Sequence, residues 1–600
     1  MKHSKKFAAM MAALALTACS IAPMFSFAEG EEAPKYTITV GTTAANGYSG
    51  DKAEHTYEAY QIFKGTVEIG EDGEPTGKLE GIEWGSSITE TGIYAELAKI
   101  TINDENPFTD EDGNDLTSAA EVAAVLGSAS DDSALAKAFA DAIGANLTGT
   151  GVEIKDDAEF EGGYYLIQDK NGSPVIDDSD VVEGAKTRYI LKVVGNITIN
   201  PKSGVPSVEK KVVENTKKAT ESYEQGAYKP DNEYLNDVAD YCISDTVPFE
   251  LIGTLPDAYA DYDTYFYQFT DTLGSQFNDP TDIEVVAVNE GEEEADITSS
   301  FTKSAITANE DGAKVFTLTC DNLKGINGVT IDKDTVIVVR YNAVLNENAV
   351  IGLPGQENKV DLTYSRNPNH KGNGGTTPEG PDDHGKTPED KVIVFTYELD
   401  TNKYLDKADA AHLAAAGQAG FKLYRTVDGV EQVATLINNK ITGWVDVTDA
   451  NRDTAGTQIE TVANNSFNFI GLDDGTYTLV ETKVPTGYNK MADLEMTINA
   501  TTANNQSWIG EPDKALTALK LTHTGDDYEY IANNLEQDAE DGTKADNLGI
   551  VRDEIINKSG STLPSTGGIG TTIFYLGGGA MVAVAGVFLI TKKRMGKREN

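Results

Sequence analysis

The chain has 600 residues, of which 97 are acidic and 48 are basic, so its formal net charge at pH 7 is −49. This length predicts several domains. The charge argues against nucleic acid and anionic membranes as partners, because both repel a strongly acidic protein. A solvated extracellular surface is the simplest explanation of such a composition.

The N-terminus has the layout of a secretory signal peptide. Lysines precede an apolar segment that begins at Phe7, and small residues suitable for cleavage follow at 26–28. We therefore expect a signal peptide over residues 1–28. The alternative is a lipoprotein, since residues 16–19 resemble a lipobox in which Cys19 would be lipidated.

Residues 29–200 combine strand and helix patterns. Apolar patterning predicts four strands, at Tyr36–Val40, Tyr60–Phe63, Gly163–Ile167 and Thr187–Thr198. Helix-forming residues at helical spacing predict three helices, at Ile93–Ile100, Ala119–Leu126 and Ser133–Ile143. The acidic stretch Asp104–Asp115 lacks the register of an EF-hand, so a solvated loop is expected there and no metal. The region reads as a β domain with inserted helices.

Residues 201–369 are almost wholly β in character. The period of two in a strand places Lys210 on the same face as two valines. In two other strands the same alternation places Asp271 and Asn358 on the face that carries the apolar residues. Three polar side chains that point into one core are costly to bury singly, so together they indicate a chemical cluster.

The chemistry expected of this cluster is an intramolecular isopeptide bond. Burial lowers the pKa of a lysine and raises that of a carboxylic acid, which makes a neutral amine and a protonated acid accessible. Lys210 would attack the side-chain carbonyl of Asn358, Asp271 would polarise that carbonyl and carry protons, and ammonia would leave. The alternative is a buried salt bridge between Lys210 and Asp271 without bond formation.

Two cysteines remain in the exported chain, Cys242 and Cys320, and both lie in strand-like runs. An extracellular location permits a disulfide between them. Two buried free thiols fit the sequence equally well.

Residues 370–390 are dense in Gly, Pro, Asn, Thr and Asp and read as a linker. The third region, residues 391–558, opens with a strand in which Lys403 falls on the same face as the apolar residues. Farther along, Glu481 falls on the same face as Tyr477, which aims a second carboxylate inward.

Residues 559–600 contain a pentapeptide, an apolar run and a basic end. No charged residue occurs from Ile569 to Thr591, which is long enough for a helix to cross a bilayer, and the basic cluster that follows would stay on the cytoplasmic side. The pentapeptide just before the run consists of Leu563, Pro564, Ser565, Thr566 and Gly567.

This C-terminal arrangement resembles the sorting signal of Gram-positive surface proteins, which sortase cleaves between Thr and Gly. The strand-Pro-Lys stretch at 197–202 resembles the motif of shaft pilins that supplies the amine used by sortase. The resemblance implies that Thr566 of one subunit is joined to Lys202 of the next. The membrane span would then hold the precursor only transiently.

The middle of the chain carries a second resemblance. Residues 201–369 resemble the isopeptide-forming domain of fimbrial subunits, and the stretch around Glu481 resembles the E-box of CnaB-type domains, which are Greek-key β-sandwiches. For the third region this implies a bond from Lys403 to Asn557 with Glu481 as proton carrier. The interval between Glu481 and Asn557 is longer than is usual in that family. Both bonds are expected to join the first and last strands of their domains.

Nearly the whole chain thus resembles a Gram-positive major (shaft) pilin: tandem Ig-like or CnaB-type β-sandwiches, a signal peptide and a sorting helix. The resemblance implies a cell-wall pilus, with sortase, further copies of the chain, minor pilins, peptidoglycan and a host ligand as partners. The six histidines are scattered and no metal spacing or nucleophile elbow is present, so neither an enzyme, a cofactor nor a metal is expected. The alternative is a monomeric wall-anchored adhesin, or a tip or basal pilin, in which Lys202 would be inert.

Overall fold

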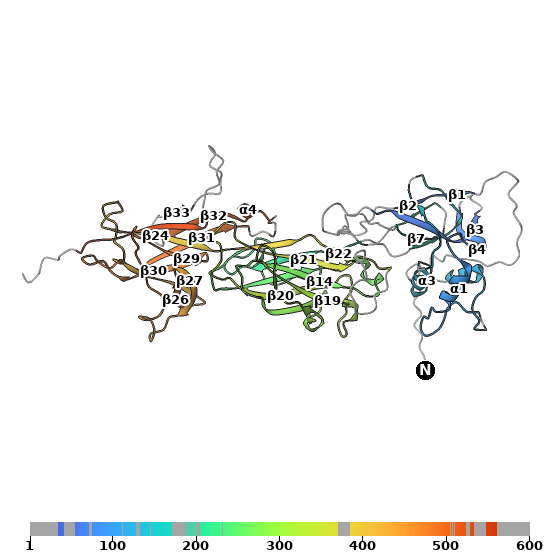
Figure 1. The fold of residues 1–600 in the computed structure, drawn as a ribbon, viewed down its shortest axis with the longest axis horizontal. Coiled ribbons are helices and arrows are strands. Elements are labelled where there is room, and N and C mark those ends of the chain that lie inside the picture. The colour runs from blue at the N-terminus through green and yellow to red at the C-terminus, as the bar shows by residue number, and fades with distance from the viewer. Residues whose placement is uncertain are drawn as a thin grey trace, which may run out of the picture.

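The computed structural model describes residues 34–40, 55–70, 75–170, 185, 190–193, 196–199, 204–369, 384–523, 529–532 and 548–560, apart from short gaps within these ranges. The predicted signal peptide, Lys202 and the sorting signal lie outside the described residues. Within the described part, no helix is long and apolar enough to cross a membrane. The fold is mainly β, as predicted, and the three regions follow one another along the long axis of the molecule (Figure 1).

The first region contains a five-stranded sheet and three helices. The sheet has the order β4 (Pro75–Trp84), β3 (Tyr57–Ile69), β7 (Gly163–Asp169), β8 (Ile190–Val193), and β5 (Val152–Glu153) pairs with β3. Two short pairs accompany it, β1 (Lys35–Tyr36) with β6 (Phe160–Glu161) and β2 (Ile38–Val40) with β9 (Ile197–Ile199). The helices are α1 (Glu90–Leu97), α2 (Ala119–Leu126) and α3 (Ala134–Gly144).

The helices of this region lie against one face of its sheet. Val122 of α2 and Phe139 of α3 belong to the same buried cluster as Phe63 of the sheet. Helix α2 has the predicted bounds because Ser118 and Glu121 form a capping box, in which each side chain bonds to the other residue's backbone N–H. The mixed character predicted for residues 29–200 is therefore confirmed.

The second region is a sandwich of two sheets. The first sheet has the order β11 (Leu235–Asn236), β10 (Val208–Val213), β13 (Thr246–Gly253), β20 (Val336–Val344), β15 (Thr281–Val288), β16 (Ala295–Asp296). The second has the order β12 (Val238–Asp240), β23 (Asp390–Phe395), β21 (Gln356–Ser365), β14 (Tyr267–Leu273), β19 (Lys314–Cys320), β17 (Thr302–Lys303), with β18 (Thr307–Ala308) on β19 and β22 (His384–Lys386) on β21. Three 3-10 turns lie in its loops, at Asp257–Asp261, Thr298–Ser300 and Leu323–Gly325.

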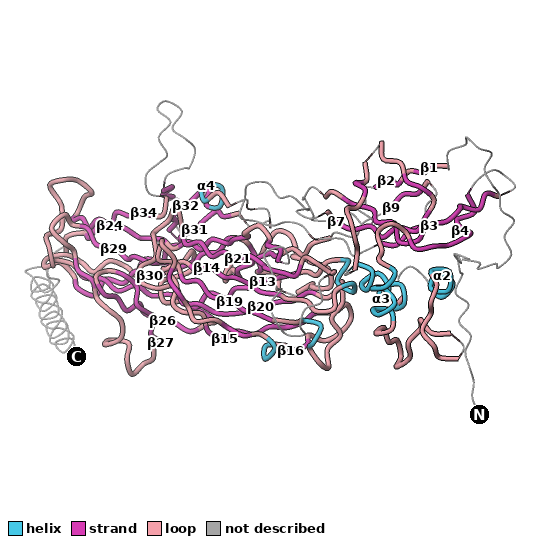
Figure 2. Tube along the Cα trace, turned by 45° about the vertical axis from the view of Figure 1, so that its right-hand side comes forward, coloured by secondary structure: helices cyan, strands magenta, loops and turns pink. Residues whose placement is uncertain are grey.

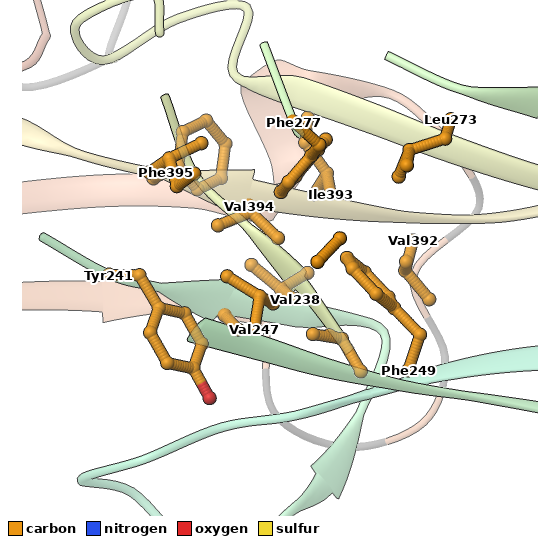
Figure 3. Close-up of a cluster of buried hydrophobic side chains, with 14 of the residues drawn as sticks. Val238, Tyr241, Val247, Phe249, Leu273, Phe277, Val392, Ile393, Val394 and Phe395 are labelled. Carbon is orange, nitrogen blue, oxygen red and sulfur yellow. The ribbon is translucent and has the colours of Figure 1, made fainter. Parts of the chain in front are cut away.

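The space between the two sheets is filled with apolar side chains. Figure 3 shows part of this core, where Val247 and Phe249 of the first sheet lie close to Val238, Ile393 and Val394 of the second. All five side chains are at most 1% exposed. A polar side chain that points into this layer is therefore removed from water.

The end of the second region differs from the expectation. Strand β23 was expected to open the third region, but it pairs with β21 and β12 and so completes the second sheet of the sandwich. Strand β22, predicted as linker, also pairs with β21. The Gly- and Pro-rich stretch is thus a connection within the sandwich, and only Thr396 separates β23 from the first strand of the third region.

The third region is built on one eleven-stranded sheet. Its order is β33 (Glu529–Ala532), β32 (Leu516–His523), β31 (Leu494–Thr502), β30 (Gly475–Lys483), β25 (Gly420–Val427), β26 (Val430–Ile437), β27 (Lys440–Asp446), β29 (Ser466–Leu472), β24 (Tyr397–Leu405), β34 (Ile550–Asn557), with β28 (Ile459–Glu460) on β25 and a short helix α4 (Pro512–Ala515). The first strand, β24, and the last, β34, run parallel to each other.

The second and third regions are in close contact. The backbone N–H of Ile243 donates to the carbonyl of Gly471 at 3.0 Å, and that of Gly352 donates to the carbonyl of Thr396 at 2.9 Å. Their apolar residues also form one continuous buried cluster. Figure 2 shows the strands of the two regions running on from one another.

Candidate functional site

Lys210, Asp271 and Asn358 come together in the core of the second region. Lys210 lies in β10 of the first sheet, whereas Asp271 in β14 and Asn358 in β21 are neighbours in the second sheet. Each side chain is at most 1% exposed. A bond between Lys210 and Asn358 would therefore connect the two sheets.

Tyr341 of β20 links the three side chains, and the four residues are called the Lys210 cluster below. The Lys210 ammonium donates to Asp271 Oδ2 and, at 3.2 Å, to the hydroxyl of Tyr341. That hydroxyl donates to Asp271 Oδ2 at 2.9 Å and accepts from Asn358 Nδ2 at 2.7 Å. Tyr341 does not stand out in the sequence, although a tyrosine on the same face of a buried strand as Val339 requires a polar partner for its hydroxyl.

The surroundings of the Lys210 cluster favour uncharged forms. Burial lowers the pKa of Lys210, although the charge of Asp271 opposes the shift. Burial likewise raises the pKa of Asp271. The lysine nitrogen lies 5.7 Å from the centre of the Phe249 ring, so apolar surface surrounds it. Proton transfer from the amine to the acid is thereby made easier than in water.

Lys403, Glu481 and Asn557 form the Lys403 cluster in the third region. The parallel pairing of β24 with β34 sets Lys403 opposite Ile555 and Leu405 opposite Asn557, which places Lys403 and Asn557 near each other. Glu481 Oε2 accepts from Asn557 Nδ2 at 3.0 Å, and Glu481 Oε1 lies 4.0 Å from the lysine nitrogen. The three side chains are at most 1% exposed.

Backbone groups hold the acid and the amide of the Lys403 cluster in place. The N–H of Met491 donates to Glu481 Oε2 at 2.9 Å, and Asn557 Nδ2 donates to the carbonyl of Asn489 at 2.7 Å. Burial lowers the pKa of Lys403 to about 8. No pattern in the sequence identified Met491 or Asn489, because their contribution is made by the backbone of a loop.

The two clusters share a chemical feature that a simple salt bridge does not require. In each, one carboxyl oxygen and the asparagine carbonyl oxygen are buried without a hydrogen-bond partner, namely Asp271 Oδ1, Asn358 Oδ1, Glu481 Oε1 and Asn557 Oδ1. Unsatisfied buried acceptors cost free energy. A protonated acid beside each carbonyl would satisfy them, and this is also the arrangement that polarises an amide for attack by an amine.

The disulfide considered for Cys242 and Cys320 is not formed, and both are buried free thiols. Cys242 lies where the second region meets the third, and its sulfur accepts from Arg425 Nη1 at 3.3 Å. Cys320 lies in β19, where burial raises its pKa to about 11. The two thiols thus have separate structural environments.

Two segments match known protein families. Residues 404–511 match the SpaA family, described as a prealbumin-like fold domain, and residues 555–595 match the LPXTG cell wall anchor motif. The first match contains Glu481, begins directly after Lys403 and ends before Asn557. The second contains the pentapeptide and the predicted membrane span.

The trypsin-resistant surface T6 protein of Streptococcus pyogenes serotype M6 is 26% identical over 289 residues, which are 43% of this chain and 48% of that protein. The matched part thus spans about half the length of this curated relative. Among solved structures, the T6 backbone pilin of that species has a TM-score of 0.42 at 15% identity, with 88% of this chain and 98% of the other covered. The major pilin SpaD of Corynebacterium diphtheriae has a TM-score of 0.40 at 15% identity, with 88% and 98% covered.

The family matches and the streptococcal relative support the resemblance to Gram-positive major pilins. They also support a location at the cell wall. They do not test the roles of individual residues.

Proposed function

We propose that this chain is the backbone subunit of a cell-wall-anchored pilus and that sortase polymerises it covalently. The observation that carries the proposal is the combination of the LPXTG anchor with two buried Lys–acid–Asn clusters in consecutive β regions. A filament under tension gains from cross-links in every subunit, because each subunit carries the load of the whole filament.

The link between subunits joins Thr566 of the sorting signal to Lys202, which lies where the first region meets the second. The sortase cysteine attacks the carbonyl of Thr566 and releases Gly567 with the membrane span, which leaves a thioester. The amine of Lys202 on the next subunit displaces the cysteine and forms an amide. This head-to-tail contact does not close on itself, so it generates a filament. The last subunit is transferred to an amine of the peptidoglycan, and minor pilins join by the same chemistry.

Each internal bond forms once, in the Lys210 and Lys403 clusters. Proton transfer to the acid leaves a neutral lysine amine, which attacks the side-chain carbon of the asparagine while the protonated acid polarises the carbonyl. The acid then returns a proton to the departing nitrogen, and the products are an amide and ammonia. The buried contacts of Asp271 and Glu481 support these roles.

The experiment that tests the proposal replaces the linking lysine. Pili extracted from cells that express the Lys202→Ala variant are resolved by denaturing electrophoresis. Lys99→Ala is the matched control, because Lys99 is a lysine of the first region whose side chain is 68% exposed. We expect the ladder of covalent polymers to disappear for Lys202→Ala and to persist for Lys99→Ala.

Persistence of the full ladder in Lys202→Ala would contradict the proposed linkage. Absence of a ladder in the parent chain, with the protein still attached to the cell wall, would instead favour the monomeric adhesin. The experiment therefore separates the two functional classes.

A further inference from the structure

Three aspartates form a buried cluster where the second region meets the third. Asp240 ends β12 of the second region, and Asp473 and Asp474 form the turn between β29 and β30 of the third. One carboxylate oxygen from each residue lies within 4.8 Å of the other two. The side chains, called the junction cluster below, are 1%, 6% and 7% exposed.

Each carboxylate of the junction cluster is fixed by a neutral donor on one oxygen. Tyr397 donates to Asp240 Oδ2, Asn215 to Asp473 Oδ2 and Thr216 to Asp474 Oδ1, each at 2.8 Å. Metal-binding carboxylates are commonly oriented in this way, with one oxygen held by the protein and the other presented to the ion.

The opposite oxygens of two of these carboxylates have no donor outside the cluster. Asp240 Oδ1 and Asp473 Oδ1 are fully buried acceptors that receive no hydrogen bond from a group outside the cluster, and the carboxyl groups of Asp240 and Asp473 lie within hydrogen-bonding distance of each other. Burying several carboxylate oxygens of like charge close together costs free energy unless a cation or a proton lies between them.

The protein supplies too little positive charge to balance the cluster. Lys217 forms a salt bridge with Asp474 and lies 3.6 Å from Asp240. Among the described residues, no basic side chain forms a salt bridge with Asp473. Glu214, which is 2% exposed, adds a fourth acid nearby.

We propose that the junction cluster binds one calcium ion, which ties the second region to the third. Carboxylate oxygens are the ligands that calcium prefers, and its flexible coordination accepts an irregular set completed by water. Asp473 and Asp474 line a cavity of about 730 Å³, which gives the ion and its waters a path to the cluster. The surface location exposes the site to extracellular calcium. A dissociation constant of roughly 10⁻⁴ to 10⁻³ M is sufficient for binding there.

The test is a calcium titration of the full-length chain after removal of metals with a chelator. Calorimetry of the parent chain is expected to give one site, and added calcium is expected to raise the temperature of thermal unfolding. Asp473→Asn should weaken binding by tenfold or more. Tyr397→Phe, which keeps every carboxylate but removes the hydroxyl that orients Asp240, should weaken it roughly tenfold.

Glu495→Gln is the matched control, because Glu495 is an exposed acid that lines the same cavity outside the cluster. It should bind calcium as the parent chain does. The proposal would be overturned if the parent chain showed no heat of calcium binding and no rise in its unfolding temperature. A proton shared between the carboxylates would then be the occupant. Unchanged binding in both Asp473→Asn and Tyr397→Phe would overturn it as well.

Discussion

Tyr341 contacts all three other members of the Lys210 cluster, so its hydroxyl sets the geometry in which amine, acid and amide meet. If the ring of Tyr341 were kept and its hydroxyl removed, Lys210 would be the one side-chain donor to Asp271 among the described residues. The role of Tyr341 can therefore be separated from that of the core packing around it.

We expect Tyr341→Phe to slow formation of the Lys210 to Asn358 bond roughly 10- to 150-fold, because a hydrogen bond to a charged group contributes about 1.5–3 kcal/mol. The measurement is the fraction of newly expressed chain that has lost ammonia at that bond, followed by mass spectrometry of peptides. Tyr267→Phe is the control, since its hydroxyl donates to the carbonyl of Thr254 in the same core. Equal rates for the two variants would show that Tyr341 serves packing alone.

The pKa of Lys403 gives a second prediction at the residue scale. In an Asn557→Ala chain no bond forms, so the amine stays free to titrate, with a pKa of about 8 in the folded chain against the usual lysine value of 10.5 in the unfolded chain. Between these pH values the unfolded chain binds more protons, and the free energy of unfolding therefore rises with pH, by roughly 3 kcal/mol over the window. Urea unfolding at several pH values measures it. A chain that also carries Lys403→Met should lack the rise, and equal slopes for the two chains would contradict the shift.

At the scale of elements, the Lys403 to Asn557 bond would lock β34 onto β24, the parallel pair that closes the third region. The bond would span residues 403–557, which encloses nearly every strand of that region. Removal of the bond thus lowers stability mainly by increasing the conformational entropy of the unfolded chain, and it changes the folded structure little.

We expect Asn557→Ala to reduce the stability of the third region by roughly 4 to 5 kcal/mol near neutral pH, the value for a cross-link that closes a loop of about a hundred residues or more. Thermal unfolding of the two chains measures the change. Asn499→Ala, at an exposed position of β31, is the control and should unfold as the parent does. A similar small effect for both substitutions would contradict a covalent bond at Asn557.

The sequence predicted strands best where apolar and polar residues alternate strictly. In β14 every second residue from Tyr267 to Leu273 is buried, so parity alone placed Asp271 in the core. Strand β23 is buried on both faces from Val392 to Phe395, and a continuous apolar run carries no information about which sheet it joins. The sequence prediction therefore places β23 in the wrong region. In the next strand, apolar residues alternate with polar ones, and the prediction that Lys403 lies on the buried face is correct.

For the whole molecule, the position of β23 changes the path that tension takes between Lys202 and Thr566. With both proposed bonds formed, force passes from Lys210 directly to Asn358 and from Lys403 directly to Asn557. Residues 211–357 and 404–556 are then shielded. Residues 359–402, which include β22 and β23, remain in the path, because the bond does not join the last strand of the sandwich.

We expect a chain pulled between residues 202 and 566 to extend by at most about 150 Å through release of residues 359–402, since an extended residue spans ~3.3–3.6 Å. Single-molecule force spectroscopy measures the step. Lys210→Ala should add a further step of roughly 500 Å, because residues 211–357 are no longer shielded. A step of that size in the parent chain would contradict the shielding.

The most direct test of the account is the intact mass of residues 29–562, which include every described residue, measured under denaturing and reducing conditions. We predict a mass lower than that of the sequence by two molecules of ammonia. Asp271→Ala and Glu481→Ala should each restore the mass of one ammonia molecule, after allowance for the substitution itself. An unaltered mass in the parent chain would contradict both cross-links and leave two buried lysines that are merely paired with acids.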